Sequence, residues 1–507
     1  MSKIKLPKLK KVGVEPEIKK EGYIPKDKRK TILLLSDDIR TYSGVGCQSR
    51  NIVLNTAHRY NWVNIGAAVK HPEHGKGFDL SHEINNIVGI SDSSVKVLAN
   101  DGYGDKQLLR EMIAQEKPDA IMHFTDPRYW LWLYEMENEI RQHIPLIFYT
   151  IWDDLPYPMY NREYYRSDDM LLGISKQTVN IVKNVLRDHP KPDWAIKYLP
   201  HGIDPSNFYP ISDDLEFEEH KEKTIGNEEF DFVVFHNSRN IRRKNQSDII
   251  LSWKVFLDQL PKEKAKKCLL LMKTENSDPN GTDLKAVIEN FCDPEIHKVK
   301  IVQGRFDEKI MNYLYNISDC HMFMTDNEGW GLGLTESLIA GRMIIAPVQG
   351  GMQDQMRFED ENGDWINFTT EHPSNVDGKY KKCGEWAMPI FPKTRSVKGS
   401  PITPYIFGST CSIEDAAIAL MKVYKLGPEE RKRRGLKGRE WATSKEAGFT
   451  AKRMGERFIE NIATLFKKWK PQPRFTLTKI DDSVYLNNHN PNPISLTPEF
   501  IKEIQSI

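Results

Sequence analysis

Two glutamates stand eight positions apart around three glycines in the stretch "EGWGLGLTE", residues 328–336. Glycine permits a positive φ and a close approach of the backbone, and a helix N-terminus presents unpaired N–H groups that bind phosphate. A carboxylate aimed at a phosphate would repel it, so Glu328 and Glu336 are expected to face neutral hydroxyl groups. Adjacent sugar hydroxyls supply two donors to one carboxylate. The stretch therefore predicts a phosphate at the glycines, a ribose diol at Glu336 and a second sugar at Glu328.

A group of cations follows an apolar run upstream, in "FHNSRNIRRKN", residues 235–245. Arg239 and Lys244 lie five positions apart in a loop expected at the end of a strand. Arginine offers a two-pronged fork to a phosphate, and lysine offers a point charge. The glycine-rich turn by itself is equally consistent with tight packing. Combined with these two cations, it predicts a diphosphate clamp.

The elements that must position these residues form two α/β units in series. Short apolar runs alternate with longer amphipathic stretches, a pattern typical of parallel sheets covered by helices. Ligands of such sheets bind beyond the carboxyl ends of the strands, which predicts a cleft between two Rossmann-like domains. Strands are expected at 31–38, 60–69, 119–124, 145–154, 169–175 and 194–204, and again at 230–239, 267–275, 299–306, 320–326 and 342–351.

Composition shifts mark the domain boundaries. The predicted divisions are a basic flexible arm over 1–30, a first Rossmann-like domain over 31–211, a polar linker over 212–229, a second Rossmann-like domain over 230–445 with an insertion near 352–410, and a C-terminal helix and tail over 446–507.

The net charge of the 507-residue chain is +1, but the first thirty residues carry eleven Lys or Arg and four Asp or Glu. The positive charge of this arm is consistent with binding to nucleic acid or anionic lipid. A solvated tail is favoured, because the arm has one aromatic residue, Tyr23, and lacks the interleaved aromatic residues of a nucleic-acid-binding segment. No apolar run approaches the ~20 residues of a membrane span. Six scattered cysteines without CxxC pairs argue against structural zinc and for a reducing compartment. The sequence therefore predicts a cytoplasmic protein without a membrane span.

Taken in order along the chain, these features resemble the retaining nucleotide-sugar glycosyltransferases of the GT-B fold, specifically glycosyltransferase family 4. The Glu-x7-Glu signature is matched by Glu328 and Glu336, and the family's diphosphate pair by Arg239 and Lys244. Other matching segments are "SGVG" (43–46), "DDMLLGISKQT" (168–178), "PHGIDPSNFYP" (200–210) and "QGG" (349–351). The resemblance covers roughly residues 31–465, and six matches in register are far more specific than any one alone.

The resemblance implies two facing Rossmann-like domains with parallel sheets, the first taking the acceptor and the second the nucleotide sugar, and a C-terminal helix that returns toward the first. It implies a nucleotide-diphosphate sugar as co-substrate, and a UDP-sugar is the first expectation. It implies no obligatory cofactor and no metal. The catalytic residues it implies are Glu328, Arg239, Lys244 and Thr125. The donor-binding residues it implies are Gly44, Gly46, Ser238, Gly304, Trp330, Gly331, Leu332, Gly333 and Glu336, and the acceptor-side residues are His123, Asp126, Trp152 and Asp153.

The chain departs from the family pattern in its first domain. Many members carry His-x-His after a strand, whereas "HFTDP" keeps His123 and has Thr125 at the second position. Either Thr125 or Asp126 takes that place, or the alignment slips by one residue. His123 alone is more typical of a strand-end structural histidine. Trp152 fits an acceptor-site rim and a cleft-edge loop equally well.

The implied reaction is transfer of a sugar to a hydroxyl acceptor with retention of anomeric configuration. Two alternatives are another GT-B enzyme, such as a nucleotide-sugar 2-epimerase, and a non-catalytic sugar- or DNA-binding protein of the same fold. The stretches "SDDIRTYSGV", "KPDAIMHFTDPRYW" and "WDDLPYP" resemble glycosyltransferases of large tailed bacteriophages. That resemblance implies a host-cytoplasmic location and adds hydroxymethylated DNA bases to glycans as acceptors.

Overall fold

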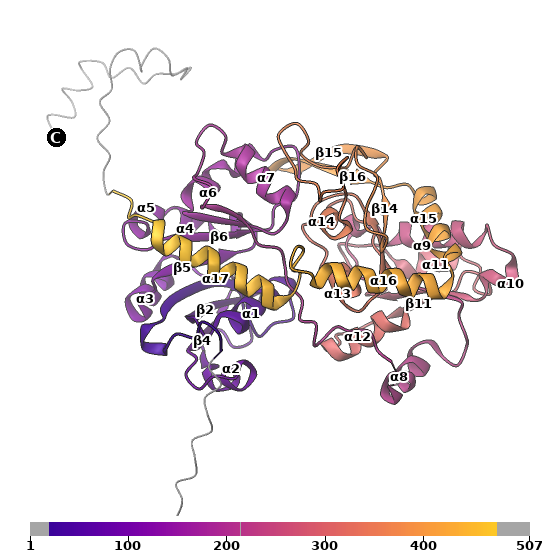
Figure 1. Ribbon diagram of the computed structural model, residues 1–507, viewed down its shortest axis with the longest axis horizontal. Coiled ribbons are helices and arrows are strands. Elements are labelled where there is room, and N and C mark those ends of the chain that lie inside the picture. Colours follow the sequence, from indigo (N-terminus) through magenta and orange to yellow (C-terminus); the bar gives the residue numbers. More distant parts are fainter. Residues whose placement is uncertain (1–19, 213, 474–507) are drawn as a thin grey trace, which may run out of the picture.

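The computed structural model describes residues 20–212 and 214–473. Two lobes lie side by side, each built on a parallel β-sheet covered by helices (Figure 1). This confirms the predicted α/β architecture with two parallel-sheet domains. Most of the predicted arm, residues 1–19, and the tail from 474 onward lie outside the described residues.

The N-terminal sheet has eight strands in the described residues, in the order β3-β4-β2-β1-β5-β6-β7-β8. Strand β3 runs antiparallel to β4, and the other neighbours are parallel. The strands are β1 Lys30–Asp37, β2 Tyr60–Ala68, β3 Gly77–Asp79, β4 Val95–Asp101, β5 Ala120–Phe124, β6 Leu146–Thr150, β7 Met170–Gly173 and β8 Ile196–Tyr198. The helices are η1 Lys26–Lys28, α1 Gly44–Thr56, α2 Ser81–Val88, α3 Lys106–Glu116, η2 Pro127–Trp130, α4 Leu131–Tyr134, α5 Glu137–Ile140, η3 Met159–Asn161, α6 Arg162–Ser167 and α7 Lys176–Val185.

The continuous apolar run of β1 follows from burial on both faces of the sheet. Ile32 and Leu34 belong to the core that α1 shares, whereas Leu33 and Leu35 belong to the separate core under α3. Successive side chains of a strand point to opposite faces, so each residue of the run meets a covering helix. Strand β4 was not among the expected strands, because polar residues break up the continuous apolar run that marks the other strands, as in "VKVLAND".

The C-terminal sheet has six parallel strands in the described residues, in the order β11-β10-β9-β12-β13-β14. They are β9 Phe232–Asn237, β10 Cys268–Lys273, β11 Val299–Val302, β12 Cys320–Met322, β13 Met343–Pro347 and β14 Ala387–Ile390. The helices are α8 Leu215–Ile225, η4 Arg242–Lys244, α9 Gln246–Leu257, α10 Lys262–Ala265, α11 Leu284–Phe291, α12 Glu308–Ile317, α13 Leu332–Ile339, α14 Met352–Met356, α15 Ile413–Lys425, α16 Gly427–Thr443 and α17 Ala451–Lys468. The segment predicted as a linker thus contains α8.

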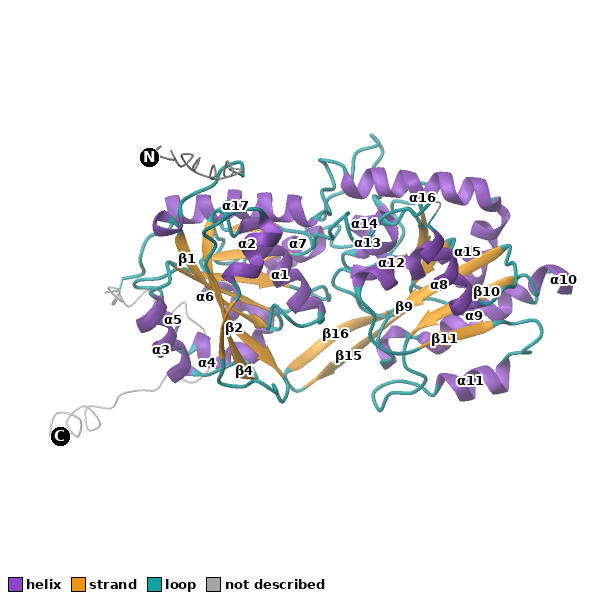
Figure 2. Cartoon of the chain, turned by 90° about the horizontal axis from the view of Figure 1, so that it is seen from below, coloured by secondary structure: helices purple, strands orange, loops and turns teal. Residues whose placement is uncertain are grey.

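The segment predicted as an insertion, 352–410, contributes β14 to the edge of the C-terminal sheet. It also forms an antiparallel hairpin from β15 Thr394–Ser400 and β16 Thr403–Thr410. The hairpin lies between the two sheets (Figure 2). Its residues meet the N-terminal domain, since the Phe407 N–H donates to the Leu155 carbonyl at 2.6 Å.

Helix α17 leaves the C-terminal domain and lies along the N-terminal lobe, as the yellow ribbon of Figure 1 shows. Phe458 packs against Tyr60 and Trp62 with ring centroids 6.2 and 5.6 Å away. A Cβ on Gly455 would stand 2.5 Å from the Asn55 Cβ, so the helix lies directly on α1. Helix α17 therefore ties the two domains together.

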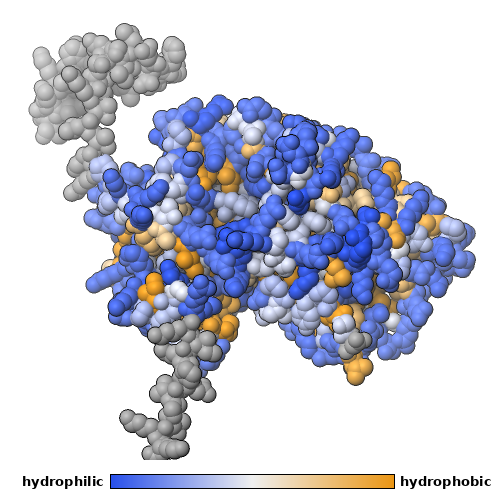
Figure 3. Space-filling model, in the orientation of Figure 1, coloured by the Kyte–Doolittle hydropathy of each residue, from blue (hydrophilic) through white to orange (hydrophobic). Residues whose placement is uncertain are grey.

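The molecular surface in the view of Figure 3 is mainly hydrophilic, with small scattered apolar areas. Within residues 20–212 and 214–473, no helix is both long enough and apolar enough to span a membrane.

Candidate active site between the two domains

A cavity of about 750 Å³ lies between the carboxyl ends of the two sheets. The N-terminal domain lines it through the loops after β1, β5 and β6, and the C-terminal domain through the loops after β9 and β12. These loops meet because parallel strands bring all their carboxyl ends to one edge of a sheet.

The glycine-rich turn forms the wall of the cavity on the C-terminal side. Gly331 adopts φ +83°, a left-handed conformation that favours glycine, and starts α13 without a side-chain cap. A Cβ on Gly333 would stand 2.9 Å from the His321 ring, so this glycine allows the helix to pack closely. Gly331, Leu332 and Gly333 all line the cavity, which gives it an uncapped helix N-terminus. Such an N-terminus attracts anions.

Lys244 and Glu328 form a buried ion pair in this cavity. The Lys244 Nζ contacts Glu328 Oε2, and the Arg243 guanidinium lies 3.5 Å from the same oxygen. Burial lowers the pKa of the Lys244 ammonium, although Glu328 opposes this effect. Burial works to raise the pKa of the Glu328 carboxyl, but Lys244 and Arg243 outweigh it and hold that pKa below its usual value. The glutamate is therefore ionised and is held by two cations.

Arg239 lines the same cavity but is two-thirds exposed. Its Nε lies 2.9 Å from the Asp278 carboxylate. The preceding Ser238 is held by two partners, with its Oγ 2.9 Å from His236 Nε2 and accepting from Gln246 Nε2 at 2.8 Å. Ser238 thus fixes the strand end, while the exposed Arg239 is free of tight packing.

Glu336 faces the cavity from the second turn of α13. It accepts a hydrogen bond of 2.6 Å from the Tyr315 hydroxyl. Burial raises the pKa of its carboxyl to about 7, although Tyr315 works in the opposite direction. Near neutral pH this carboxyl can lose its proton when hydrogen-bond donors arrive, as a sugar diol would supply.

The N-terminal wall is formed by loops rich in acidic and aromatic residues. Thr125 has φ +130°, which is strained for a residue with a side chain, and Asp126 beside it caps η2. The Trp152 indole donates to the Asp154 carbonyl at 3.0 Å. Burial and the nearby Asp154 raise the pKa of Asp153 well above its usual value, and burial raises the pKa of Asp154 to about 6. Thr125, Asp126, Trp152 and Asp153 are all brought to the cavity.

Three predicted residues do not line the cavity. His123 is fully buried, with its Nε2 3.1 Å from Asp168 and its ring stacked on Phe148, as expected of a structural histidine. Gly46 is buried in the first turn of α1, where its N–H donates to the capping Ser43 hydroxyl. Gly304 lies in an exposed turn.

The cavity also contains residues that the sequence did not single out. Arg243 and Lys244 both belong to the short helix η4, and both lie against the Glu328 carboxylate. Asp154 contacts the Asn327 amide across the two domains. The runs "IRRKN" and "WDD" contained these residues, but a sequence pattern does not show which member of a run faces inward. Tyr42 and His201 line the cavity as well.

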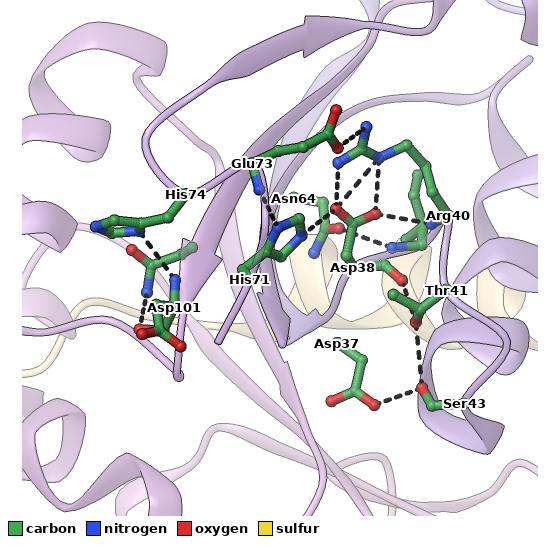
Figure 4. Close-up of polar contacts among 12 residues, drawn as sticks. Asp37, Asp38, Arg40, Thr41, Ser43, Asn64, His71, Glu73, His74 and Asp101 are labelled. Atoms are coloured by element: carbon green, nitrogen blue, oxygen red, sulfur yellow. Dashed lines mark hydrogen bonds and ion pairs between the residues drawn. The ribbon is translucent and has the colours of Figure 1, made fainter. Parts of the chain in front are cut away.

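The loop that carries Tyr42 and Gly44 is held by a buried polar network, drawn in Figure 4. Asp38 accepts from Arg40 at 2.7 Å and lies 3.2 Å from the His71 ring. Burial works to raise the pKa of Asp38, but its hydrogen bonds with Arg40 hold that pKa below the usual value. This network positions one wall of the cavity.

Within the part of the chain that the structure describes, no group of three or more His, Cys, Asp or Glu side chains could hold a metal ion.

The fold is similar to those of solved glycosyltransferases. A sucrose-phosphate synthase from Thermosynechococcus elongatus matches with a TM-score of 0.59 and 13% identity over 87% of this chain and 100% of its own. A glycosyltransferase from Rickettsia africae matches with a TM-score of 0.58 and 16% identity over 87% and 100% of the two chains. HepE from Anabaena, solved with UDP and glucose, matches with a TM-score of 0.56 and 13% identity over 86% and 100%. No protein-family model and no curated protein matches the sequence. At these identities the likeness concerns the fold, and this chain has the two-domain GT-B fold of those glycosyltransferases.

Proposed function

We propose that this protein is a glycosyltransferase that moves a sugar from a nucleotide-diphosphate sugar to a hydroxyl acceptor with retention of configuration. One observation carries the proposal: the buried pair of Lys244 and Glu328 lies in the same interdomain cavity as the uncapped N-terminus of α13. The ligands seen in the structurally similar HepE support UDP as the nucleotide.

The cavity supplies a donor site with divided roles. The α13 N-terminus, Lys244 and Arg239 would bind the diphosphate, since each offers positive charge or N–H groups. Glu336 would accept hydrogen bonds from the ribose diol. Glu328, held by Lys244, would accept from the hydroxyls of the donor sugar.

The reaction needs stabilisation of the leaving diphosphate. The bond between the sugar C1 and the diphosphate oxygen breaks, and the diphosphate takes the electron pair. The acceptor hydroxyl oxygen forms the new bond to C1 on the same face, and its proton passes to a diphosphate oxygen. Preorganised cations and N–H groups lower the barrier because they bind the charge that develops in this step.

The test is incubation of the full chain with labelled UDP-glucose, with and without an acceptor array of oligosaccharides and hydroxymethylated duplex DNA. Label on an acceptor together with released UDP supports the proposal, and the anomeric configuration of the product tests retention. Epimerised nucleotide sugar formed without any acceptor would identify the 2-epimerase alternative. UDP binding without turnover of any nucleotide sugar in a donor panel would identify a non-catalytic binding protein.

A further inference from the structure

We propose that the carboxyl edge of the N-terminal sheet carries an acceptor subsite for a carbohydrate, with Tyr129 as its stacking platform and Asp37 as its hydroxyl acceptor. The inference rests on the proposed function and names the substrate class for the acceptor side of that cavity.

Tyr129 presents an aromatic face that is already held in place. Tyr129 is 55% exposed. The ring stacks on Tyr103, with centroids 4.8 Å apart and an interplanar angle of 27°. Tyr103 in turn packs edge-on against the fully buried Trp130 at 4.9 Å. A ring supported in this way loses little conformational freedom when a ligand covers its outer face.

The supporting ring is also fixed by hydrogen bonding. The Tyr103 hydroxyl donates to Asp37 Oδ1 at 2.9 Å and also interacts with Thr125. The Ser43 hydroxyl donates to Asp37 Oδ2 at 2.5 Å, as Figure 4 shows. Both carboxylate oxygens of Asp37 therefore have hydroxyl partners, and each keeps a further lone pair for another hydroxyl.

This platform adjoins the reaction cavity. Tyr129 belongs to the same short helix, η2, as Pro127, which lines the cavity next to Asp126 and Thr125. Tyr42, next to Ser43 in the chain, lines the cavity and is 70% exposed. A ligand whose hydroxyl reaches Thr125 would therefore extend across aromatic faces.

The chemistry of these residues fits a neutral, hydroxylated ligand. The C–H faces of a sugar ring are apolar and pack on aromatic rings, while sugar hydroxyls donate to carboxylates. Within residues 20–212 and 214–473, no cation forms an ion pair with Asp37, and Arg128 is paired with Asp126 at 2.9 Å. A nucleic-acid backbone would meet an uncompensated carboxylate at this edge rather than free cations.

The test is binding of the full chain and its variants to an array of immobilised oligosaccharides of α- and β-linked hexoses, N-acetylhexosamines and heptoses. Saturation-transfer NMR on the best oligosaccharide then measures the affinity. We expect Tyr129→Ala to weaken binding roughly tenfold, as loss of one aromatic stacking contact predicts. Tyr129→Phe should bind like the unaltered protein because it keeps the ring, and Asp37→Asn should weaken binding. The matched control is Phe291→Ala, a 54% exposed ring on α11 of the other domain, which should bind normally.

The proposal is overturned if no oligosaccharide binds, if Tyr129→Ala binds as tightly as the unaltered protein, or if only hydroxymethylated duplex DNA binds. A parallel titration with UDP separates this proposal from the proposed function. Tyr129 is not among the residues that line the interdomain cavity, so its variants should keep their UDP affinity. If the unaltered protein binds no UDP, the glycosyltransferase proposal itself fails. If UDP binds but the Tyr129 substitution has no effect on sugar binding, the subsite alone fails.

Discussion

At the scale of residues, the charge of the cavity is governed by Lys244 and Glu328. Lys244 is buried, so it must be kept charged by a partner, and Glu328 provides the compensating carboxylate. Removing one member of a buried pair leaves the other charge uncompensated, which is costly. The pair therefore keeps the Lys244 ammonium charged in the cavity, where we propose that it binds the diphosphate.

Substitution of this cation tests its part in the reaction. Lys244→Ala should lower the rate of sugar transfer by about 100- to 1000-fold, the loss expected for one transition-state hydrogen-bond donor, about 2.7–4 kcal/mol. Arg239→Ala should lower it in the same direction, because Arg239 is the second predicted cation of the clamp. Steady-state turnover of UDP-glucose measures both effects. Lys285→Ala, an exposed lysine on α11, is the matched control. Near-normal turnover in both cavity variants would remove the clamp from the mechanism.

The raised pKa of Glu336 predicts a pH-dependent affinity. Burial raises this pKa from 4.5 to about 7, so the free protein keeps the carboxyl protonated at pH 6. A ribose diol donates hydrogen bonds and favours the ionised form. We therefore expect the affinity for UDP-glucose to rise as the pH increases through about 7, measured by calorimetry between pH 6 and pH 8.

The raised pKa of Glu336 also predicts how the stability of the unliganded protein depends on pH. The folded pKa lies above the unfolded value of 4.5, so the folded state binds the proton more tightly between 4.5 and about 7. This contribution to the free energy of unfolding is fully present below pH 4.5 and is lost as the pH rises through about 7. Glu336→Gln should remove the Glu336 contribution to both pH dependences, while Asp154, whose pKa is about 6, continues to titrate. A variant that keeps the full dependence on pH would show that another group is responsible.

At the scale of elements, the hairpin β15–β16 connects the two walls of the cavity. Ile406 lines the cavity, and Lys398 forms an ion pair of 2.6 Å with Asp326 at the end of the glycine-rich loop. On the other side, the Tyr160 hydroxyl donates to the Tyr405 carbonyl at 2.8 Å, and the Met159 N–H donates to the Tyr405 hydroxyl at 3.2 Å. The hairpin therefore restrains the loop that carries Trp152 and Asp153.

Truncation of Tyr405 should release this loop. In Tyr405→Ala the Met159 N–H loses its hydroxyl partner, and the ring contact with Tyr160 at 4.9 Å is lost. We expect faster amide hydrogen exchange over residues 153–161 by roughly tenfold, the factor for about 1.4 kcal/mol of local stability. Hydrogen-exchange mass spectrometry measures it. Ile402→Ala, at the exposed tip of the same hairpin, should leave that segment unchanged. Equal protection in the two variants would show that the hairpin does not restrain the loop.

At the scale of the whole molecule, α17 joins the C-terminal end of the described chain to the N-terminal domain. The crossing begins where the Ala451 N–H donates to the Ile203 carbonyl at 2.9 Å. Gly202 is needed beside it, since a Cβ there would stand 2.6 Å from the Thr450 carbonyl oxygen. The helix then completes the core on one face of the first sheet through Phe458 and Leu465.

Removal of the Phe458 ring should destabilise the first domain. Phe458→Ala creates a cavity between α17 and β2, and large-to-small substitutions of this kind cost about 3–5 kcal/mol. Urea unfolding followed by tryptophan fluorescence measures the loss, because Trp62 lies against the substituted ring. Lys467→Ala, at an exposed position of the same helix, should change stability by less than about 0.5 kcal/mol. A Phe458→Ala variant as stable as this control would show that α17 is not part of the domain core.

Local sequence pattern was sufficient to predict the two sheets and the turn that lines the C-terminal side of the cavity. The apolar runs of β1 and β9 predicted buried strands, and the glycines between Glu328 and Glu336 predicted a phosphate-binding turn at a helix start. Strands β3, β4 and β14 and the hairpin were not predicted, because none contains a long continuous apolar run. Strand β3 has three residues, β4 includes polar residues, β14 is short and contains Pro389, and β15 is exposed throughout.

Which of the chemically suitable residues meet depends on long-range packing. Lys244 and Glu328 lie 84 positions apart and pair because β9 and β12 are neighbours in the sheet, so the loops after them share one edge. His123 lies outside the cavity because strand pairing places it in the core, between Asp168 and Phe148. Asp37 ends β1 and Tyr129 follows β5, so the pairing of these strands places both residues at the same edge of the sheet, where each contacts Tyr103. Strand order is a property of long-range packing, and no local pattern of residues contains it.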